Sequence, residues 1–211
     1  MTAGVKLIWA TPNAEELVAY MARVSNPANQ DNAATAPQLL RYLVKNKHWS
    51  PFEMVNVCME INTSRDIARQ ILRHRSFSFQ EFSQRYAVAT EFDRREARLQ
   101  DVKNRQNSLL NEDRELNDMW HYKQAAVLRA ALDAYQFALD NNIAKEVARA
   151  VLPEGMTQSR MYMNGTLRSW LHYIAIRTDP ATQKEHREIA EGCKVVIEQL
   201  FPSIKEIINE V

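Results

Sequence analysis

Glycine is scarce in this sequence of 211 residues, which contains four in all. Gly4, Gly155, Gly165 and Gly192 lie too far apart to form a GxGxxG fingerprint or a Walker phosphate loop. Both loops need closely spaced glycines, because the backbone itself must approach the phosphates. The sequence therefore excludes the Rossmann and Walker modes of nucleotide binding.

Cysteine and long apolar segments are also rare. Cys58 and Cys193 form no CxxC pair, so the pattern predicts neither a zinc site nor a disulfide framework, and we expect no bound metal. No run of 18 apolar residues could span a membrane, and residues 1–6 do not begin a signal peptide. We expect a cytoplasmic protein that does not bind a membrane.

The chain also lacks a large excess of positive or negative charge. Lys and Arg number 27 against 26 Asp and Glu, which gives a net charge of +1. Any basic cluster is therefore local, which argues against a general nucleic-acid binder with a wide basic face. Hydrophobic residues make up 45% of the chain, an ordinary value for a globular protein of one substantial domain or two very small ones.

The spacing of apolar residues predicts a helix-rich α+β fold. Alternation predicts strands at residues 5–9, 52–61 and 157–163. Helical spacing predicts helices at residues 12–24 (with Asn13 as the cap), 37–45, 64–73, 111–141, 143–152, 167–176 and 184–200, and a polar loop at 26–35. The highly charged segment 90–108 is typical of either a flexible excursion or a solvated helix.

The segment from Arg73 to Tyr86 concentrates the chemistry of the chain, since it contains three arginines and a histidine. Arginine forms planar, bidentate hydrogen bonds with phosphates and carboxylates. Two of the arginines could simply complement the dipole at the end of a helix. The interleaved Phe77, Phe79 and Phe82 instead indicate a packed, extended segment. The residues favour a site for a ligand that carries phosphates.

Three further pieces each allow an ordinary structural explanation. His48–Glu53 combines a Ser-Pro turn with a carboxylate that could face water. The run Glu146-Val147-Ala148-Arg149 could be a surface ion pair at i, i+3. One predicted helix carries Arg168, His172 and Arg177 at spacings of four and five residues, so the three nearly share a face. Polar side chains on the outer face of a helix explain this pattern as well as a binding site does.

The order of these pieces resembles the flavin-dependent thymidylate synthases, the ThyX family. The family signature RHRxxSxxxxSxRY is met at Arg73-His74-Arg75, Ser78, Ser83 and Arg85-Tyr86. The elements HxSPFE, EVARxxLP and RxWxHxxxxR stand in family order around it, over about residues 5–200. The resemblance implies one catalytic domain over residues 1–211, with a small, mostly antiparallel sheet and an insertion at 90–108. It also implies a homotetramer whose active sites lie at subunit interfaces.

The resemblance further implies a methyltransferase that converts dUMP to dTMP. Methylenetetrahydrofolate supplies the carbon, NADPH reduces FAD, and the reduced flavin supplies the reducing equivalents. The implied FAD contacts are Ser50, Arg73, His74, Arg75, Glu81, Thr166, Arg168 and His172. The implied dUMP contacts are Gln70, Arg73, Glu81, Phe82, Ser83, Gln84, Arg85, Arg149 and Arg177, of which Arg177 would be catalytic and help to ionise uracil N3.

Some positions depart from the family pattern. Met54 and Thr166 stand where some members carry His and Asn, and a His often found shortly after the position of Arg177 is absent. The alternative function is a nucleotide- or nucleic-acid-binding module that uses the stripe of Arg65, Arg69, Arg73 and Arg75 without catalysis. The balanced net charge and the interleaved phenylalanines speak against it.

Overall fold

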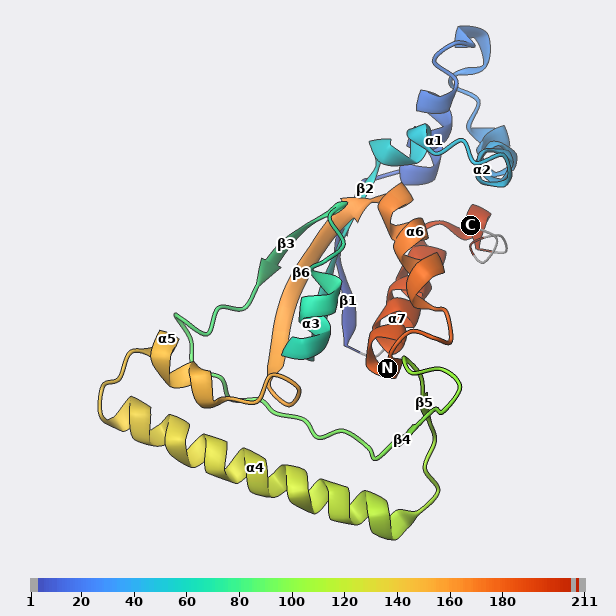
Figure 1. Cartoon of the computed structure of the whole chain (residues 1–211). Coiled ribbons are helices and arrows are strands. Elements are labelled where there is room, and N and C mark those ends of the chain that lie inside the picture. Colours follow the sequence, from blue (N-terminus) through green and yellow to red (C-terminus); the bar gives the residue numbers. More distant parts are fainter. Residues whose placement is uncertain (1–3, 206–207, 209–211) are drawn as a thin grey trace.

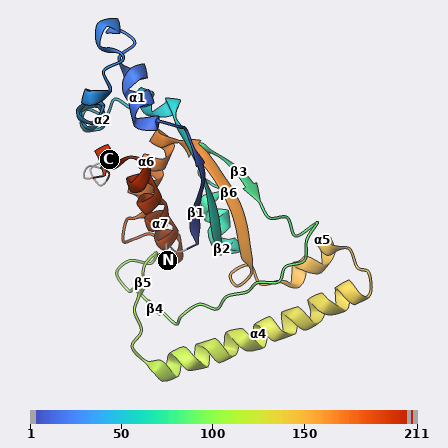
Figure 2. The same ribbon diagram turned by 180° about the vertical axis from the view of Figure 1, so that it is seen from behind.

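The computed structural model describes residues 4–205 and residue 208. Its centre is a four-stranded antiparallel sheet in the order β1-β2-β6-β3, formed by β1 (Val5–Ala10), β2 (Asn56–Ser64), β6 (Gln158–Thr166) and β3 (Phe77–Glu81). Figures 1 and 2 show this sheet from its two sides, with β1 and β3 at the edges. The helix-rich α+β fold with a small antiparallel sheet is as predicted.

Three helices cover one face of the sheet: α3 (Arg65–Ile71), α6 (Leu167–Arg177) and α7 (Lys184–Leu200). Two of them begin without a loop, because β2 runs directly into α3 and β6 runs directly into α6. Thr166 makes the second junction, since its hydroxyl accepts a hydrogen bond of 3.2 Å from the backbone N–H of Ser169. The strands therefore set the directions of these two helices.

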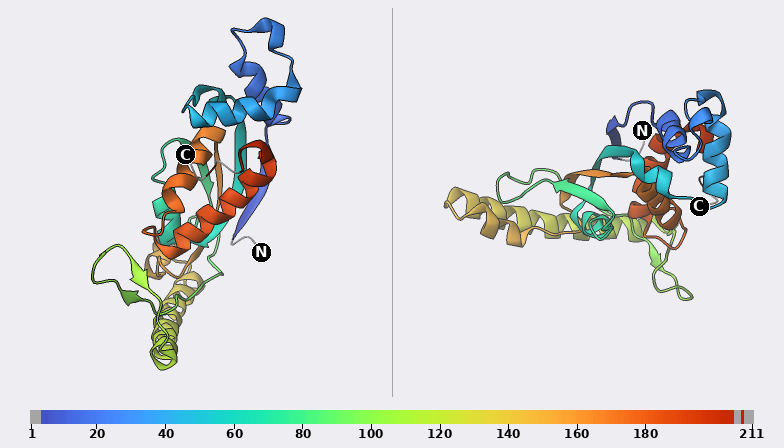
Figure 3. Two further views of the ribbon diagram at one scale, coloured as in Figure 1. Left: turned by 90° about the vertical axis from the view of Figure 1, so that its right-hand side faces the viewer. Right: turned by 90° about the horizontal axis from the view of Figure 1, so that it is seen from above.

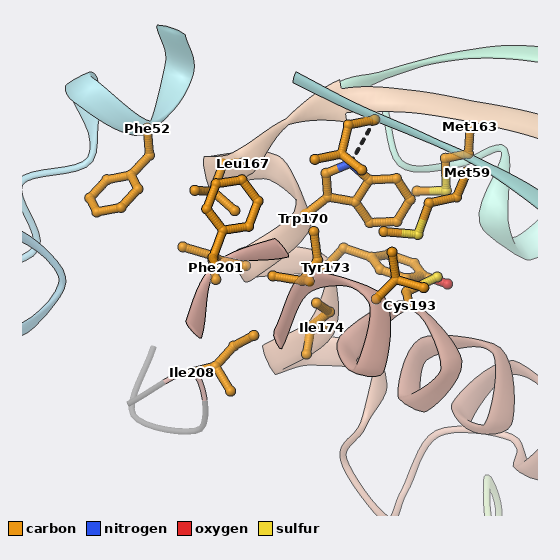
Figure 4. Packing of buried hydrophobic residues seen from close by; sticks show 14 of the residues in the cluster. Phe52, Met59, Met163, Leu167, Trp170, Tyr173, Ile174, Cys193, Phe201 and Ile208 are labelled. Atoms are coloured by element: carbon orange, nitrogen blue, oxygen red, sulfur yellow. Dashed lines mark hydrogen bonds between the residues drawn. The ribbon is translucent and has the colours of Figure 1, made fainter. Parts of the chain in front are cut away.

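The main core lies between the sheet and these helices. Figure 4 shows Trp170 and Tyr173 of α6 close to Met59 and Met163 of the sheet and to Cys193 of α7. The buried indole N–H of Trp170 donates to the carbonyl of Val57 at 3.0 Å, which satisfies its polar group. Such a core fixes the direction from which α6 presents its polar side chains.

Gly165 lets β3 approach β6 closely. It pairs with Phe77 in the register of the two strands, and a Cβ at this position would overlap the Phe77 ring. The Phe77 ring also packs edge-on to Trp170, with 4.8 Å between the centroids. This contact locks the start of β3, and the RHR triplet before it, against α6.

The remaining elements lie outside this layer. Helices α1 (Ala14–Ala22) and α2 (Ala36–Lys45) sit above the sheet in Figure 1, joined to it through the 3₁₀ turn η3 (Ser50–Met54). Helix α4 (Arg114–Asp140) runs below and beyond the sheet, as Figures 1 and 3 show. The short elements are η1 (Pro27–Asn29), η2 (Ala33–Thr35), β4 (Leu99–Gln100), β5 (Ser108–Leu109), α5 (Lys145–Ala148), η4 (Arg149–Val151) and η5 (Pro202–Ile204).

Helix α4 has few contacts within the chain. Only Gln124, Tyr135 and Ala138 of its residues are buried. Its exposed apolar side chains are Leu116, Met119, Trp120, Tyr122, Val127 and Phe137. None of the described helices combines the length and apolar character that a membrane span requires.

Several boundaries differ from the sequence predictions. The strand expected at 52–61 begins later, because Pro51 starts the 3₁₀ turn of residues 50–54. Asn13 precedes α1 but adopts a left-handed conformation with φ of 49°, and its side chain makes no cap hydrogen bond. The loop 26–35 contains two 3₁₀ turns. A helix in segment 90–108 is wrong, since the segment is irregular apart from the short β4–β5 pair.

Candidate active site

Glu53 organises the first group of predicted site residues. Its carboxylate accepts hydrogen bonds of 2.6 Å from the Thr166 hydroxyl and 2.6 Å from the Arg168 guanidinium. The Thr166 hydrogen bond, helped by Arg168 and opposed by burial, holds the pKa of Glu53 below its ordinary value. We call Glu53, Thr166, Arg168 and His172 the Glu53 cluster. Ser50 lies nearby in sequence at the exposed start of η3.

His172 is the member of this cluster with unused hydrogen-bonding capacity. Its ring packs edge-on to Trp49, with 4.9 Å between the centroids. Burial first, and the Arg168 charge second, lower the pKa of His172, although Glu53 acts in the opposite direction. Its Nε2 atom is buried and has no hydrogen-bond partner among the described residues. A neutral imidazole therefore offers one buried ring nitrogen to a ligand.

Arg177 and His74 form the second group. The Arg177 Nε–H donates to His74 Nε2 at 2.9 Å. Burial, followed by the charges of Arg177 and Arg73, lowers the pKa of His74 to about 4, so the ring is neutral at pH 7 and can accept this bond. Tyr173 packs edge-on to the same ring at 4.9 Å. The two Nη groups of Arg177 remain available for another acceptor.

A cavity of about 360 Å³ lies beside this pair. Arg177 and Gln70, which are both predicted dUMP contacts, line it together with Gln106 and Gln183. Behind Gln70 lies His186, which is fully buried and has its pKa lowered to about 3 by burial, then by Arg177 and His74. We call His74, Arg177, Gln70, Tyr173 and His186 the His74 cluster.

The predicted helix face of α6 needs a correction. Arg168 and His172 do share a face of α6, because Arg168 donates to Glu53 and the charge of Glu53 acts on the His172 ring. Arg177 does not share it, since it contacts His74 on another side of the helix. A step of five residues turns the direction by about 140° at 3.6 residues per turn. One helix therefore serves two groups of site residues.

The Glu81 carboxylate is already bound to other side chains of the protein. Its carboxylate accepts hydrogen bonds from Ser159 at 2.8 Å and from Arg69 at 3.2 Å, and it lies 3.7 Å from the buried Arg65. Glu154 pairs with the same two arginines. Two members of the proposed arginine stripe are thus neutralised, which removes the continuous basic face that a nucleic-acid-binding module would need.

Residues 83–86, which we call the Arg85 loop, form a more open group. Arg85 pairs with Glu146 at 3.2 Å, and both side chains are more than half exposed. Gln84 is buried, and its Nε2 atom has no partner among the described residues. Ser83 is half-buried and accepts the backbone N–H of Tyr86 through its carbonyl. The loop therefore offers the Gln84 Nε2 group, unpartnered among the described residues, and a guanidinium whose ion pair is exposed.

The last predicted residues are cations and an aromatic. Arg73 and Arg75 are exposed and Arg149 is half-buried, and the described residues provide no ion pair or side-chain hydrogen bond to any of the three. Phe82 is half-buried, and its N–H donates to the carbonyl of Arg160 at 2.8 Å. The three guanidiniums are therefore free to bind anions.

The chain does not bring all predicted residues together. Strand β3 begins opposite Gly165, beside the α6 groups, and ends opposite Met161 before the Arg85 loop. The loop and Arg149 therefore lie beyond the far end of β3 from the Glu53 cluster. Two predicted halves of a site stand at opposite ends of one strand.

Sequence reasoning missed several members. Tyr173, Gln183 and His186 were not predicted, and Glu53 was only weakly indicated. The available signal was the polar run Gln183–His186 directly after the Asp-Pro turn that follows Arg177. Burial raises the pKa of the Cys58 and Cys193 thiols, so neither is set up as a nucleophile.

Comparisons with known proteins identify the family of the chain. The family model described as thymidylate synthase complementing protein matches residues 6–203. A flavin-dependent thymidylate synthase of Synechocystis is 52% identical over 90% of this chain and 87% of that protein. A probable flavin-dependent thymidylate synthase of Paramecium bursaria Chlorella virus 1 is 49% identical over 93% and 91% of the two chains.

The solved structures that resemble this chain include a nucleotide methylase. The crystal structure of the UMP/dUMP methylase PolB from Streptomyces cacaoi, bound with 5-Br dUMP, matches with a TM-score of 0.83 and 26% identity, over 96% of this chain and 92% of that one. With a family model matched from residue 6 to residue 203 and two relatives near half identical, this chain belongs to the thymidylate synthase complementing protein family, that of the flavin-dependent thymidylate synthases.

Proposed function

We propose that this protein methylates dUMP to dTMP, with FAD as cofactor, methylenetetrahydrofolate as carbon donor and NADPH as reductant. The observation that carries the proposal is Arg177, which is fixed by a neutral His74 and lines a cavity together with Gln70. A fixed guanidinium at a polar cavity can stabilise negative charge that develops on a ring nitrogen. Family membership gives the reaction class.

The residues present fit FAD. The buried His172 Nε2, which has no partner among the described residues, can take a polar atom of the ligand. Thr166 and Arg168 are bonded to Glu53 in the same cluster, and Ser50 begins the turn η3 that carries Glu53. Arg73 and Arg75 can balance a pyrophosphate, with His74 between them in the chain. Glu81, at the other end of β3, would contact FAD by exchanging one of its partners within the chain, Ser159 or Arg69. When bound, the flavin supplies the reducing equivalents, and the protein contributes orientation and charge.

The dUMP phosphate would be held by the Arg85 loop and Arg149. Arg85 can exchange the exposed carboxylate of Glu146 for a phosphate, because such a surface pair is worth only about 0–1 kcal/mol. The unpartnered Gln84 Nε2, the Ser83 hydroxyl and the half-buried Phe82 would complete this end of the site.

The uracil ring would lie against Arg177 and Gln70. His74 uses the Nε–H of Arg177, so the Nη groups can face the N3–C4 edge of the base. The positive charge lowers the free energy needed to remove the N3 proton. A guanidinium suits this role because it does not itself lose a proton in proteins.

Two features support the proposal of a homotetramer with shared sites. The Glu53 cluster and the Arg85 loop stand at opposite ends of β3, so one chain does not bring all the proposed contacts to a single site. Helix α4 exposes six large apolar side chains, and an apolar surface of this kind favours contact with another copy. A second chain would then supply the missing half of each site.

The test is release of tritium from 5-tritiated dUMP in the presence of methylenetetrahydrofolate and NADPH. We expect release that depends on FAD, and purified protein that is yellow and yields FAD on denaturation. Colourless protein that cannot be reconstituted with FAD, or the absence of tritium release from FAD-loaded protein, would contradict the proposal.

A further inference from the structure

Five polar side chains beside the cavity form a hydrogen-bonded chain. Tyr173 OH lies 3.2 Å from His186 Nε2, and His186 Nδ1 lies 3.2 Å from Gln70 Oε1. Gln70 Nε2 donates to Gln183 Oε1 at 2.8 Å, and Gln183 Nε2 donates to Glu185 Oε2 at 3.1 Å. The chain links α6, α3 and the start of α7.

The carboxylate of Glu185 gives this chain one direction. An ionised carboxylate only accepts, so Gln183 must point its NH₂ group at Glu185 and its oxygen at Gln70. Gln70 must then donate to Gln183 and accept from His186 Nδ1–H. That leaves His186 Nε2 as an acceptor for Tyr173. The amide of Gln70, which lines the cavity with Arg177, therefore has one allowed orientation.

Glu185 stays ionised because segment 90–108 surrounds it with arginines. Arg98 Nη1 lies 2.7 Å from one oxygen and Arg95 Nη1 lies 2.8 Å from the other. Burial opposes ionisation, but the Arg98 hydrogen bond and the two positive charges outweigh it and lower the pKa of Glu185 to about 2. Arg95 also contacts both oxygens of Asp66, at 2.8 and 3.1 Å.

The segment that carries these arginines is itself anchored. The side-chain amide of Gln124 in α4 binds both backbone polar groups of Arg95. It accepts the N–H at 2.8 Å and donates to the carbonyl at 2.8 Å. The backbone N–H of Ala97 donates to Asn117 of the same helix at 2.9 Å. Further along, Gln106 reaches the wall of the cavity itself. Segment 90–108 is thus fastened to α4 at one end and borders the site at the other.

We propose that Glu185 is a positioning residue for the substrate, which fixes the Gln70 amide through Gln183, and that segment 90–108 is the part of the active site that holds Glu185 in place. The inference rests on the proposed function in one respect, namely that the ligand beside Gln70 is dUMP. It gives a role to the charged segment and to four polar residues that the family signature does not include.

The test compares Glu185→Gln with the matched control Glu188→Gln, which lies one turn further along α7 and is half exposed. A glutamine at 185 can donate as well as accept, so it no longer imposes a direction on the chain. We expect Glu185→Gln to raise the KM for dUMP and the Kd of labelled dUMP about tenfold, the equivalent of one hydrogen bond. The kcat and the FAD content should change much less, whereas the melting temperature should fall because Arg95 and Arg98 lose a charged partner. Glu188→Gln should match the wild type.

A double-mutant cycle separates positioning from a general structural effect. If Glu185 acts through Gln70, adding Glu185→Gln to Gln70→Ala should have little further effect on dUMP binding. Gln183→Ala removes the hydrogen bonds that connect Gln70 to Glu185. It should reproduce the tenfold loss if Glu185→Gln does not fold. Wild-type dUMP affinity in Glu185→Gln, or losses that add fully to those of Gln70→Ala, would overturn the inference. Wild-type protein that binds dUMP but releases no tritium would contradict the proposed function and leave this binding test valid.

Discussion

The α6 side of the molecule and the Arg85 loop present their polar groups in different ways. On the α6 side, Glu53, His74 and Arg177 are partly buried and bonded to neighbours that strands and helices hold in place. In the Arg85 loop, the main ion pair is more than half exposed on both partners. The first region is arranged before a ligand arrives, whereas the second can take its final arrangement from a phosphate and from a neighbouring copy.

Removal of Arg177 should have the largest effect. We expect Arg177→Ala to lower the kcat for dTMP formation about 10³-fold, because one preorganised charge that faces the transition state is lost. The fold should survive, since the side chain is only partly buried. Tritium release and melting temperature measure the two effects. Turnover like that of the wild type would show that this guanidinium does not activate the base.

Acid should destabilise the α6 side through its two neutral histidines. His74 and His186 have folded-state pKa values of about 4 and about 3, below the ordinary value of 6.5. The unfolded chain therefore binds more protons below pH 6.5, and stability is lost as the pH falls from 6.5 towards 4 for His74 and towards 3 for His186. The total loss is on the order of a few kcal/mol. Thermal unfolding between pH 7 and pH 4 measures it, and His186→Asn should flatten the curve.

Glu53→Gln should weaken FAD binding about 10- to 150-fold, because hydrogen bonds to a charged group contribute about 1.5–3 kcal/mol. The variant leaves Thr166 and Arg168 with a poorer acceptor. Because the pKa of Glu53 is lowered in the folded protein, the ionised carboxylate stabilises the fold above its ordinary pKa. This stabilisation is lost as the pH falls through the lower folded value. FAD titration at pH 7 is the measurement, with Glu60→Gln on the exposed side of β2 as the control.

The smallest effect is expected in the Arg85 loop. Glu146→Ala should lower the melting temperature by about 4 °C or less, because an exposed ion pair contributes about 0–1 kcal/mol. The KM for dUMP should stay within about threefold and should fall rather than rise, since Arg85 is released for the phosphate. A large loss of stability would mean that the loop is as firmly arranged as the α6 side, and the contrast between the two regions would disappear.

The sequence predicted the regular parts of the fold well. Helix α7 begins and ends at the predicted residues, and β1, β6, α4 and α6 lie close to their predicted positions, because their apolar spacing is strong. The signature also led to the family that the comparisons identify. The individual roles of the site residues remain predictions, since they came from the resemblance.

The rest depends on contacts between distant residues. Nothing local shows that Arg65 and Arg69 pair with Glu81 and Glu154, so the stripe looked like a free basic face. Segment 90–108 lacks helical spacing, and its order comes from Gln124 and Glu185, which lie far along the chain. The five-residue step from His172 to Arg177 looked like one helix face until the partners were known.

The central claim is that the α6 region of one chain works with the Arg85 loop and Arg149 of another. Mixing subunits of two impaired variants, Arg177→Ala and Arg149→Ala, tests it most directly. Random reassembly of shared sites should restore about a quarter of the wild-type rate of tritium release, because about one site in four would combine an intact half from each variant. A mixture no more active than the two variants measured apart, with exchange of subunits verified, would contradict the account.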